Sequence, residues 1–173
     1  MLFRSTQLHW GAPKWMEASN YLEKFLNLTL SLINTGLFKQ GLDMLHKLRQ
    51  LDKTKEIAQQ WQSVYTGISI ICNRRTPFHR DSKGRPEWYD TLVSYSACGT
   101  WPLLSIWDLG LDLNYASRTV VSFCGTILEH QVSYWGVRDR ICYAHFMWES
   151  VRKRLDVSPA GWVKQEIYLS NQL

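Results

Sequence analysis

The apolar pattern of this chain changes its period near residue 64, and this change limits the folds that the chain can adopt. Before residue 64, apolar residues recur at helical spacing, which is typical of helices packed against a core. After it, short runs rich in β-branched and aromatic residues follow one another, separated by Gly, Pro and Asn. We therefore expect helices first and a β-rich region afterwards.

Three helices are expected before residue 64, after an irregular arm over residues 1–16, and a fourth near the C-terminal end. They span residues 17–33, residues 37–51, a short segment capped by Asp52 or Thr54 and reaching Trp61, and residues 149–155. The first helix is expected to bury one apolar stripe. The stripe consists of Tyr21, Leu22, Phe25, Leu26, Thr29, Leu30 and Ile33.

Six strands are expected in the β-rich region. They span residues 68–72, 91–96, 111–115, 119–124, 127–131 and 141–148. Short strands at close spacing indicate a sandwich or jelly roll. The predicted fold class is α+β, with a double-stranded β-helix (jelly-roll, cupin-like) core braced by the N-terminal helices. We expect one domain over 1–173, with helical support in 1–62, the core in 63–155 and a tail in 156–173.

Composition sets broad limits on partners and compartment. The 173 residues carry a net charge of +5 and a pI of about 9.1, which suits a polyanionic partner such as nucleic acid without requiring one. The four cysteines are widely spaced, which favours a reducing compartment and neither a zinc ribbon nor a disulfide framework. The first ten residues do not resemble a secretory signal, and no apolar run is long enough to predict a membrane span.

His79 and Asp81 are the first candidate site residues. Two residues apart on an extended strand, they point to the same face, so an imidazole and a carboxylate converge from one rigid element. Together they make two-thirds of the 2-His-1-carboxylate set that binds non-haem iron(II). The pair alone is weak evidence, since a strand His followed by a turn Asp is the commoner origin of this tripeptide.

A third ligand must come from another strand. His9 lies in the arm and His46 on a predicted helix, which leaves His130 and His145. His130 is expected at the end of a strand, where a jelly roll returns beside its first strands. Ten positions later comes Arg140, which can hold a dicarboxylate by two charge-assisted hydrogen bonds. The alternative to this binding role is that residues 138–140 form an ion-pair cluster on the surface.

This order and spacing resemble the iron(II)- and 2-oxoglutarate-dependent dioxygenases and, more closely, the TET/JBP family of DNA base oxygenases in a compact stand-alone form. The resemblance covers roughly residues 63–155. The residues that carry it are NRRTPFHRD (73–81), EWYD (87–90), TVV (119–121), Gly125, His130 and VRDRICY (137–143).

The resemblance implies roles for individual residues. His79, Asp81 and His130 would bind iron(II), and Arg140 would pair with the distal carboxylate of 2-oxoglutarate, with O2 as the oxidant. Arg74 matches a family position near the co-substrate and the target base, and Phe146 matches one that stacks on a flipped base. The next base-contacting position in the family is a His. It falls here on Trp148, a departure that leaves the recognised base open, with His145 as a possible substitute.

Cations near the metal motif are candidates for contact with phosphates. Lys83 and Arg85 lie on a Gly/Pro loop directly after Asp81, although loop cations are often merely solvated. A second basic cluster over residues 152–154 is more typical of a solvated helix end. For Phe146 and Trp148, ordinary core packing is the alternative to a base pocket.

The expected function is oxidation of a methylated DNA base, with 5-methylcytosine converted to 5-hydroxymethylcytosine and further oxidised forms. Oxidative demethylation of N6-methyladenine by the same site is an alternative. A catalytically silent jelly roll that binds modified DNA, and an oxygenase acting on RNA or protein, are others. Methylated DNA is the expected partner, with no membrane and no obligate protein partner evident. A nuclear location follows only from a DNA substrate.

Overall fold

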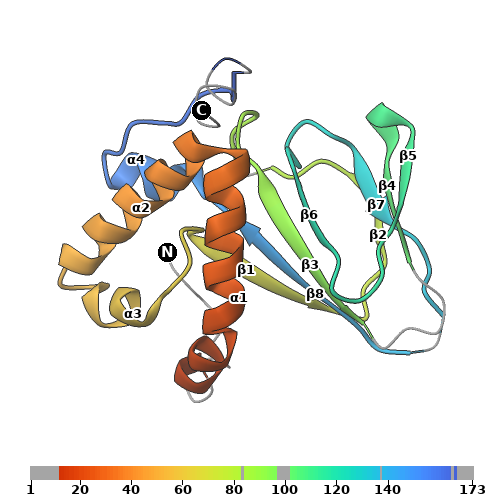
Figure 1. The fold of residues 1–173 in the computed structure, drawn as a ribbon, viewed down its shortest axis with the longest axis horizontal. Coiled ribbons are helices and arrows are strands. Elements are labelled where there is room, and N and C mark those ends of the chain that lie inside the picture. Colours follow the sequence, from red (N-terminus) through yellow and green to blue (C-terminus); the bar gives the residue numbers. More distant parts are fainter. Residues whose placement is uncertain (1–11, 83, 97–101, 137, 165, 167–173) are drawn as a thin grey trace. The chain divides into compact units, whose positions relative to one another are not determined.

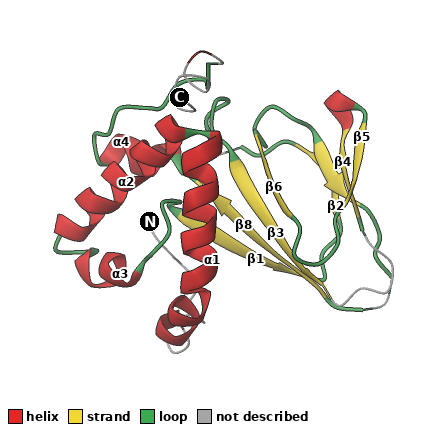
Figure 2. Cartoon of the chain, in the orientation of Figure 1, coloured by secondary structure: helices red, strands yellow, loops and turns green. Residues whose placement is uncertain are grey.

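The computed structural model describes residues 12–82, 84–96, 102–136, 138–164 and 166. The chain forms two compact units, which are considered separately. One unit comprises Met1–Gly67 with Trp148–Leu173, and the other comprises Ile68–Met147. Figure 1 traces the chain through both units, and Figure 2 shows that the described helices belong mainly to the first and the strands to the second.

The first unit contains the four α-helices found in the described part of the chain. They are α1 (Ala12–Ile33), α2 (Thr35–Gln50), α3 (Lys55–Gln60) and α4 (Glu149–Arg154). All four expected helices are present, but α1 begins at Ala12 and not at residue 17, because Pro13 is tolerated in the first turn of a helix. Asn34 ends α1 and caps α2, its side-chain oxygen accepting from the Leu37 amide at 3.0 Å.

The buried face of α1 differs from the expected one. Leu26 and Leu30 are buried, whereas Tyr21 and Phe25, expected in the same stripe, are exposed. The sequence pattern is ambiguous because α1 is apolar on two faces. No described helix is both long and apolar enough to span a lipid bilayer.

Within the residues that the structure describes, the second unit holds two four-stranded antiparallel sheets, so the α+β class is confirmed. One sheet has the order β1-β8-β3-β6 and the other β2-β7-β4-β5. The strands are β1 (Gly67–Cys72), β2 (Thr76–His79), β3 (Asp90–Ser96), β4 (Leu103–Ile106), β5 (Leu111–Asn114), β6 (Val120–Phe123), β7 (His130–Val132) and β8 (Arg140–Phe146). A short 3-10 helix, Trp107–Leu109, joins β4 to β5.

The core of this unit lies between the two sheets. Leu104 and Val132 come from one sheet, Phe123 and Cys142 from the other, and Tyr115 follows β5. Since side chains alternate across a strand, the face of each strand that carries one of these residues is the face turned inward. This assignment decides which candidate site residues face the core.

Two strand predictions were wrong in extent. Residues 127–129 are not part of the strand, so β7 begins at His130, and His130 opens this strand where the prediction placed it near the end. The last strand ends at Phe146, and Trp148 is the residue that precedes α4. Strand β4 was not predicted, because its four residues are almost uniformly apolar and follow Pro102 with no alternating pattern.

Candidate metal centre

Two imidazoles meet where β2 pairs with β7. His79 is the last residue of β2 and His130 the first of β7, and the two are direct partners across the antiparallel ladder. Directly opposed residues share a face, and their ring centroids lie 4.2 Å apart. His130 lies two residues from the core residue Val132, and its ring packs edge-on against Phe123 at 4.9 Å. The pair therefore faces the core and not the outer surface of the sheet.

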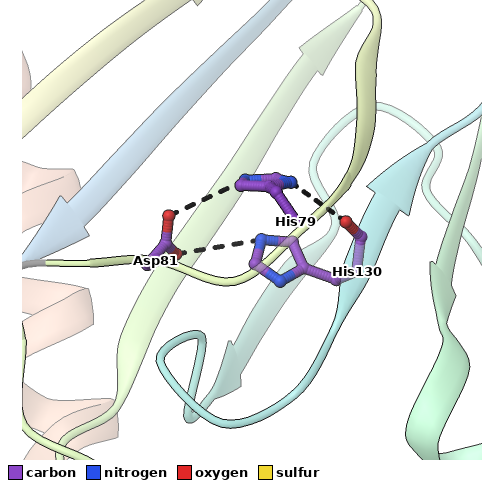
Figure 3. Close-up of side chains that lie close together, drawn as sticks. All are labelled: His79, Asp81 and His130. Atoms are coloured by element: carbon purple, nitrogen blue, oxygen red, sulfur yellow. Dashed lines mark hydrogen bonds and ion pairs between the residues drawn. The ribbon is translucent and has the colours of Figure 1, made fainter.

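Asp81 completes the cluster from just beyond the end of β2. Its backbone amide donates to the Gly125 carbonyl at 2.9 Å, which fixes the chain after the strand. Its two carboxylate oxygens lie 3.7 Å from His79 Nε2 and 3.8 Å from His130 Nε2 (Figure 3). Donors bound at about 2.1 Å to one cation lie roughly 3.0–4.2 Å apart, so both distances suit a shared metal ion.

The hydrogen bonds of the two histidines leave the metal-binding nitrogens free. His130 Nδ1 lies 2.9 Å from the Leu128 carbonyl, and His79 Nδ1 lies 2.9 and 3.0 Å from the carbonyls of Pro77 and His130. A carbonyl only accepts, so each Nδ1 carries the proton and donates it, and each Nε2 presents a lone pair toward Asp81. Burial lowers the pKa of His130, which favours the neutral, metal-binding form.

A second carboxyl group lies beside Asp81. A Cβ added at Gly125 would come within 2.4 Å of Asp81 Oδ2 and 2.7 Å of Asp90 Oδ2, so both oxygens flank this glycine. Burial, followed by the Asp81 carboxylate, raises the pKa of Asp90 to about 8. Asp90 is therefore largely protonated at neutral pH.

Arg140 lies in the core at the start of β8. It is 1% exposed, and its inward face is shared with Cys142. The guanidinium lies over the rings of Tyr115 and Trp135, 5.4 and 5.5 Å from their centroids. Its Nη1 donates to the Arg74 carbonyl at 3.4 Å, but its Nε has no hydrogen-bond partner among the described residues.

A buried charge that lacks part of its hydrogen bonding is costly, so the orphaned Nε marks a place where an anionic ligand would be stabilised. His130 and Arg140 face the same core from opposite sheets. The donor set of the described residues thus fits a metal ion, and a buried guanidinium faces the same core from the other sheet.

Asn73 fastens the start of β8. Its side-chain oxygen accepts from the Arg140 amide at 2.7 Å, its side-chain nitrogen donates to Asp139 at 2.7 Å, and its own amide donates to the Arg140 carbonyl at 2.8 Å. Asn73 adopts a left-handed backbone (φ 51°), which Asn tolerates better than most residues. Because Asp139 is bonded to Asn73 and Arg140 is buried, the alternative of a surface ion-pair cluster is wrong for Arg140.

The residues expected to contact a base are divided between different environments. Phe146 shares the inward face of β8 with Arg140 and is half-buried, whereas the fully buried His145 points to the opposite face. Arg140 and Phe146 thus share one face of β8 and His145 lies on the other, and the suggested substitution of His145 for the family's His stays a prediction. Trp148 belongs to the helical unit, where its amide donates to Thr66 Oγ1 at 2.9 Å.

The expected phosphate contacts are only partly described. Lys83 lies outside the described residues. Arg85 donates to Glu87 at 2.9 Å through Nε, so an acidic neighbour offsets its charge. Arg74 is exposed, and the contact that it makes with Arg140 is through its carbonyl.

Sequence reasoning did not assign a site role to Asp90, Gly125, Tyr115 or Trp135. Asp90 and Gly125 fall within the motifs quoted for the resemblance, but their closeness to Asp81 arises from pairing between distant strands. A carboxyl group directly before the predicted strand over residues 91–96 was the available signal for Asp90.

The fold and the donor set define a two-sheet α+β protein with a 2-His-1-carboxylate cluster, the set typical of non-haem iron(II) oxygenases. No family model matches the chain, and no curated protein matches it. Among solved structures, the chain is similar to NgTET1 in its complex with 5mC DNA, with a TM-score of 0.65 at 13% sequence identity. The match covers 98% of this chain and 62% of the NgTET1 chain, which shows a TET-like fold.

Proposed function

We propose that this chain is an Fe(II)- and 2-oxoglutarate-dependent dioxygenase that oxidises methylated bases in DNA. In this proposal His79, Asp81 and His130 hold the iron, and Arg140 binds the distal carboxylate of 2-oxoglutarate. The observation that carries it is the convergence of two imidazole Nε2 atoms on one carboxylate, with both Nδ1 atoms engaged by carbonyls. The TET-like fold supports a jelly-roll core. A single catalytic domain over residues 1–173 is part of the same proposal.

In this proposal some side chains bind the metal and another orients the co-substrate. Iron(II) held by three protein donors would keep coordination positions open. It would enable O2 to oxidise 2-oxoglutarate and a C–H bond of the substrate. His79 and His130 keep their rings fixed through Nδ1, and Asp81 offsets the charge of the cation. Arg140 orients the diacid by its far carboxylate, and the aromatic rings beside it keep water away from that contact.

DNA is the proposed substrate class for two reasons. The fold neighbour was solved in complex with 5mC DNA, and this chain has a net charge of +5. A methyl group on a paired base cannot reach a metal in a protein core, so the base must leave the stack, and Phe146 is the proposed stacking partner. Arg74, Arg85, Lys83 and Trp148 are proposed as further DNA contacts. A nuclear location is part of the same proposal.

5-Methylcytosine, oxidised to 5-hydroxymethylcytosine and beyond, is the proposed substrate, and N6-methyladenine is the alternative. Both chemistries begin by hydroxylating a methyl group. On N6-methyladenine the product would lose formaldehyde and leave adenine. This alternative is kept because Trp148 stands where the family has a base-contacting His, so the recognised base is left open.

The test is an incubation of the protein with Fe(II), 2-oxoglutarate, O2 and matched duplexes carrying 5-methylcytosine, N6-methyladenine or no methyl group. Digestion and mass spectrometry of the nucleosides, together with succinate release, measure turnover. An oxidised cytosine supports the proposal, and loss of N6-methyladenine supports its alternative. Binding of methylated duplex without succinate or a new nucleoside would overturn the enzyme in favour of a silent binding module.

A further inference from the structure

Helix α1 carries a second apolar face that the described residues of its own unit leave exposed. Tyr21, Phe25, Leu28 and Leu32 are 87%, 53%, 59% and 66% exposed. The inward face of the same helix is occupied by other residues, with Leu26 and Leu30 buried. Contiguous exposed apolar surface of this kind is uncommon on an isolated protein and marks an interaction site.

The spacing of these four residues specifies the shape of what covers them. They are separated by four, three and four positions along α1, which is the a/d spacing of a heptad repeat. Such a seam runs almost parallel to the helix axis and takes the side chains of another helix between its own. Nucleic acid is a poor fit, because the four positions carry no charge.

We propose that this seam pairs with the same seam of a second copy of the chain, with the two α1 helices antiparallel. Reversal about the midpoint of the seam places Tyr21 against Leu32 of the second copy and Phe25 against Leu28 of the second copy. Each aromatic ring thereby meets a leucine, and all four residues are used twice in a two-fold symmetric contact.

The charges beside the seam agree with this register. Lys24 and Glu17 are the nearest exposed charged residues on α1. In the antiparallel arrangement Lys24 comes beside Ser31 of the second copy, so no like charges are opposed. A parallel pair would instead stack Tyr21 on Tyr21 and Phe25 on Phe25, which places the bulkiest residues in the same layers.

The size of the seam sets the expected strength of the dimer. Covering the four side chains would bury roughly 400–500 Å² on each copy and about 1,000 Å² in the pair, at the low end of specific interfaces. We therefore expect a reversible dimer with a dissociation constant in the micromolar range. This association is independent of the metal site and of the proposed enzyme activity.

Sedimentation velocity of the full chain over about 1–300 µM tests the proposal. Phe25→Glu combined with Leu28→Glu should convert the dimer to monomer at every concentration, because each copy would place two carboxylates in the seam and the pair would bring four together. Lys24→Glu, on the same helix but beside the seam, should leave the dimer in place. Since all three side chains are exposed, circular dichroism should be unchanged. A chain that stays monomeric throughout, or a dimer that survives the double substitution, would overturn the proposal.

Disulfide trapping tests the orientation. In a background with Cys72 and Cys98 replaced by Ser, an equimolar mixture of Phe25→Cys and Leu28→Cys chains should form a cross-linked dimer on oxidation. Phe25→Cys alone should cross-link poorly, since the two copies of position 25 are not opposed in an antiparallel pair. Efficient cross-linking of Phe25→Cys alone would overturn the antiparallel register.

Discussion

The amide of Asp81 donates to the carbonyl of Gly125 at 2.9 Å, and the missing side chain of that glycine makes room for the Asp81 carboxylate. This backbone hydrogen bond thus joins the metal motif after β2 to the turn after β6. Gly125 lies outside the ligand set, yet it determines where the carboxylate lies.

Gly125→Ala should therefore damage metal binding without removing a ligand. The added methyl group would lie 2.4 Å from Asp81 Oδ2 and 2.7 Å from Asp90 Oδ2, so the carboxylate must move. We expect affinity for Fe(II), or for Co(II) as a spectroscopic substitute, to fall by about 10–100-fold. Gly36→Ala is the matched control, because its methyl group would meet its nearest neighbour at an ordinary 3.7 Å. Equal metal affinity in both variants would contradict this role.

His79→Ala and Asp81→Ala should each abolish turnover and leave the fold intact. Each removes one of three donors, and both side chains are partly exposed, so the loss of packing is small. His46→Ala, which removes an exposed imidazole from α2, should retain full activity. Succinate release measures turnover, and thermal unfolding of the chelator-treated proteins checks the fold. An active His79→Ala enzyme, with iron and 2-oxoglutarate supplied, would mean that the metal is held elsewhere.

Arg140→Lys should raise the KM for 2-oxoglutarate by about 10–100-fold with a smaller change in kcat. Lysine keeps the charge but lacks the planar fork that holds a carboxylate with two hydrogen bonds. Arg154→Lys, at an exposed position on α4, should leave both constants unchanged. Steady-state kinetics with varied 2-oxoglutarate separates the two constants. A fall in kcat at unchanged KM would place Arg140 outside the co-substrate site.

Asp90→Asn should change how the stability of the metal-free protein depends on pH. The pKa of Asp90 is about 8 in the folded chain against 3.8 for an ordinary Asp, so the folded state holds the proton more tightly than the unfolded state. That contribution is complete below about pH 4 and is lost as pH rises through about 8. Asn cannot titrate. Between about pH 4 and 8, the free energy of unfolding of the variant should therefore rise relative to that of the native protein by roughly 1.4 kcal/mol per pH unit.

Urea unfolding in the presence of a chelator at pH 5.5, 7 and 8.5 measures this difference. The free energy of unfolding of Asp90→Asn, relative to the native chain, should be most favourable at pH 8.5. Parallel profiles for the two proteins would show that Asp90 does not titrate between pH 5.5 and 8.5.

Asn73→Ala and Asn73→Gly together separate a hydrogen-bond effect from a backbone effect. Both lose the side-chain bonds to the Arg140 amide and to Asp139, but only Ala is strained at a φ of 51°. We expect Asn73→Ala to destabilise the chain by about 1–3 kcal/mol and Asn73→Gly by somewhat less. Thermal unfolding measures stability, and a raised KM for 2-oxoglutarate in both variants would report on Arg140. Greater stability of the Ala variant would contradict the strain argument.

The sequence predicted the elements whose patterns are local. The helices, β3, β6 and β8 follow from spacing and β-propensity, and the His79–Asp81 pair follows from its own two-residue separation. No local pattern distinguishes His130 from His145 as the third ligand. The resemblance to a family decided in favour of His130. The structure places this residue beside His79, although at the start of its strand and not near the end.

Contacts between segments that are far apart in the sequence could not be predicted from it. The closeness of Asp81, Asp90 and Gly125 depends on three segments that meet in space, and the aromatic rings around Arg140 come from the chain after β5 and β7. The two apolar faces of α1 were merged into one stripe, because composition alone does not say which face a helix buries. The opposite orientations of His145 and Phe146 required the register of β8 to be known.

The metal donors gather where β2 pairs with β7, whereas Arg140 belongs to β8 in the other sheet. A diacid that contacted both the metal and Arg140 would link the two sheets. The ligand would then restrict the motion of one sheet relative to the other, in addition to the apolar core between them. The empty protein should accordingly exchange its inner-strand amide hydrogens faster than the loaded one, and the site would report on the rigidity of the whole sandwich.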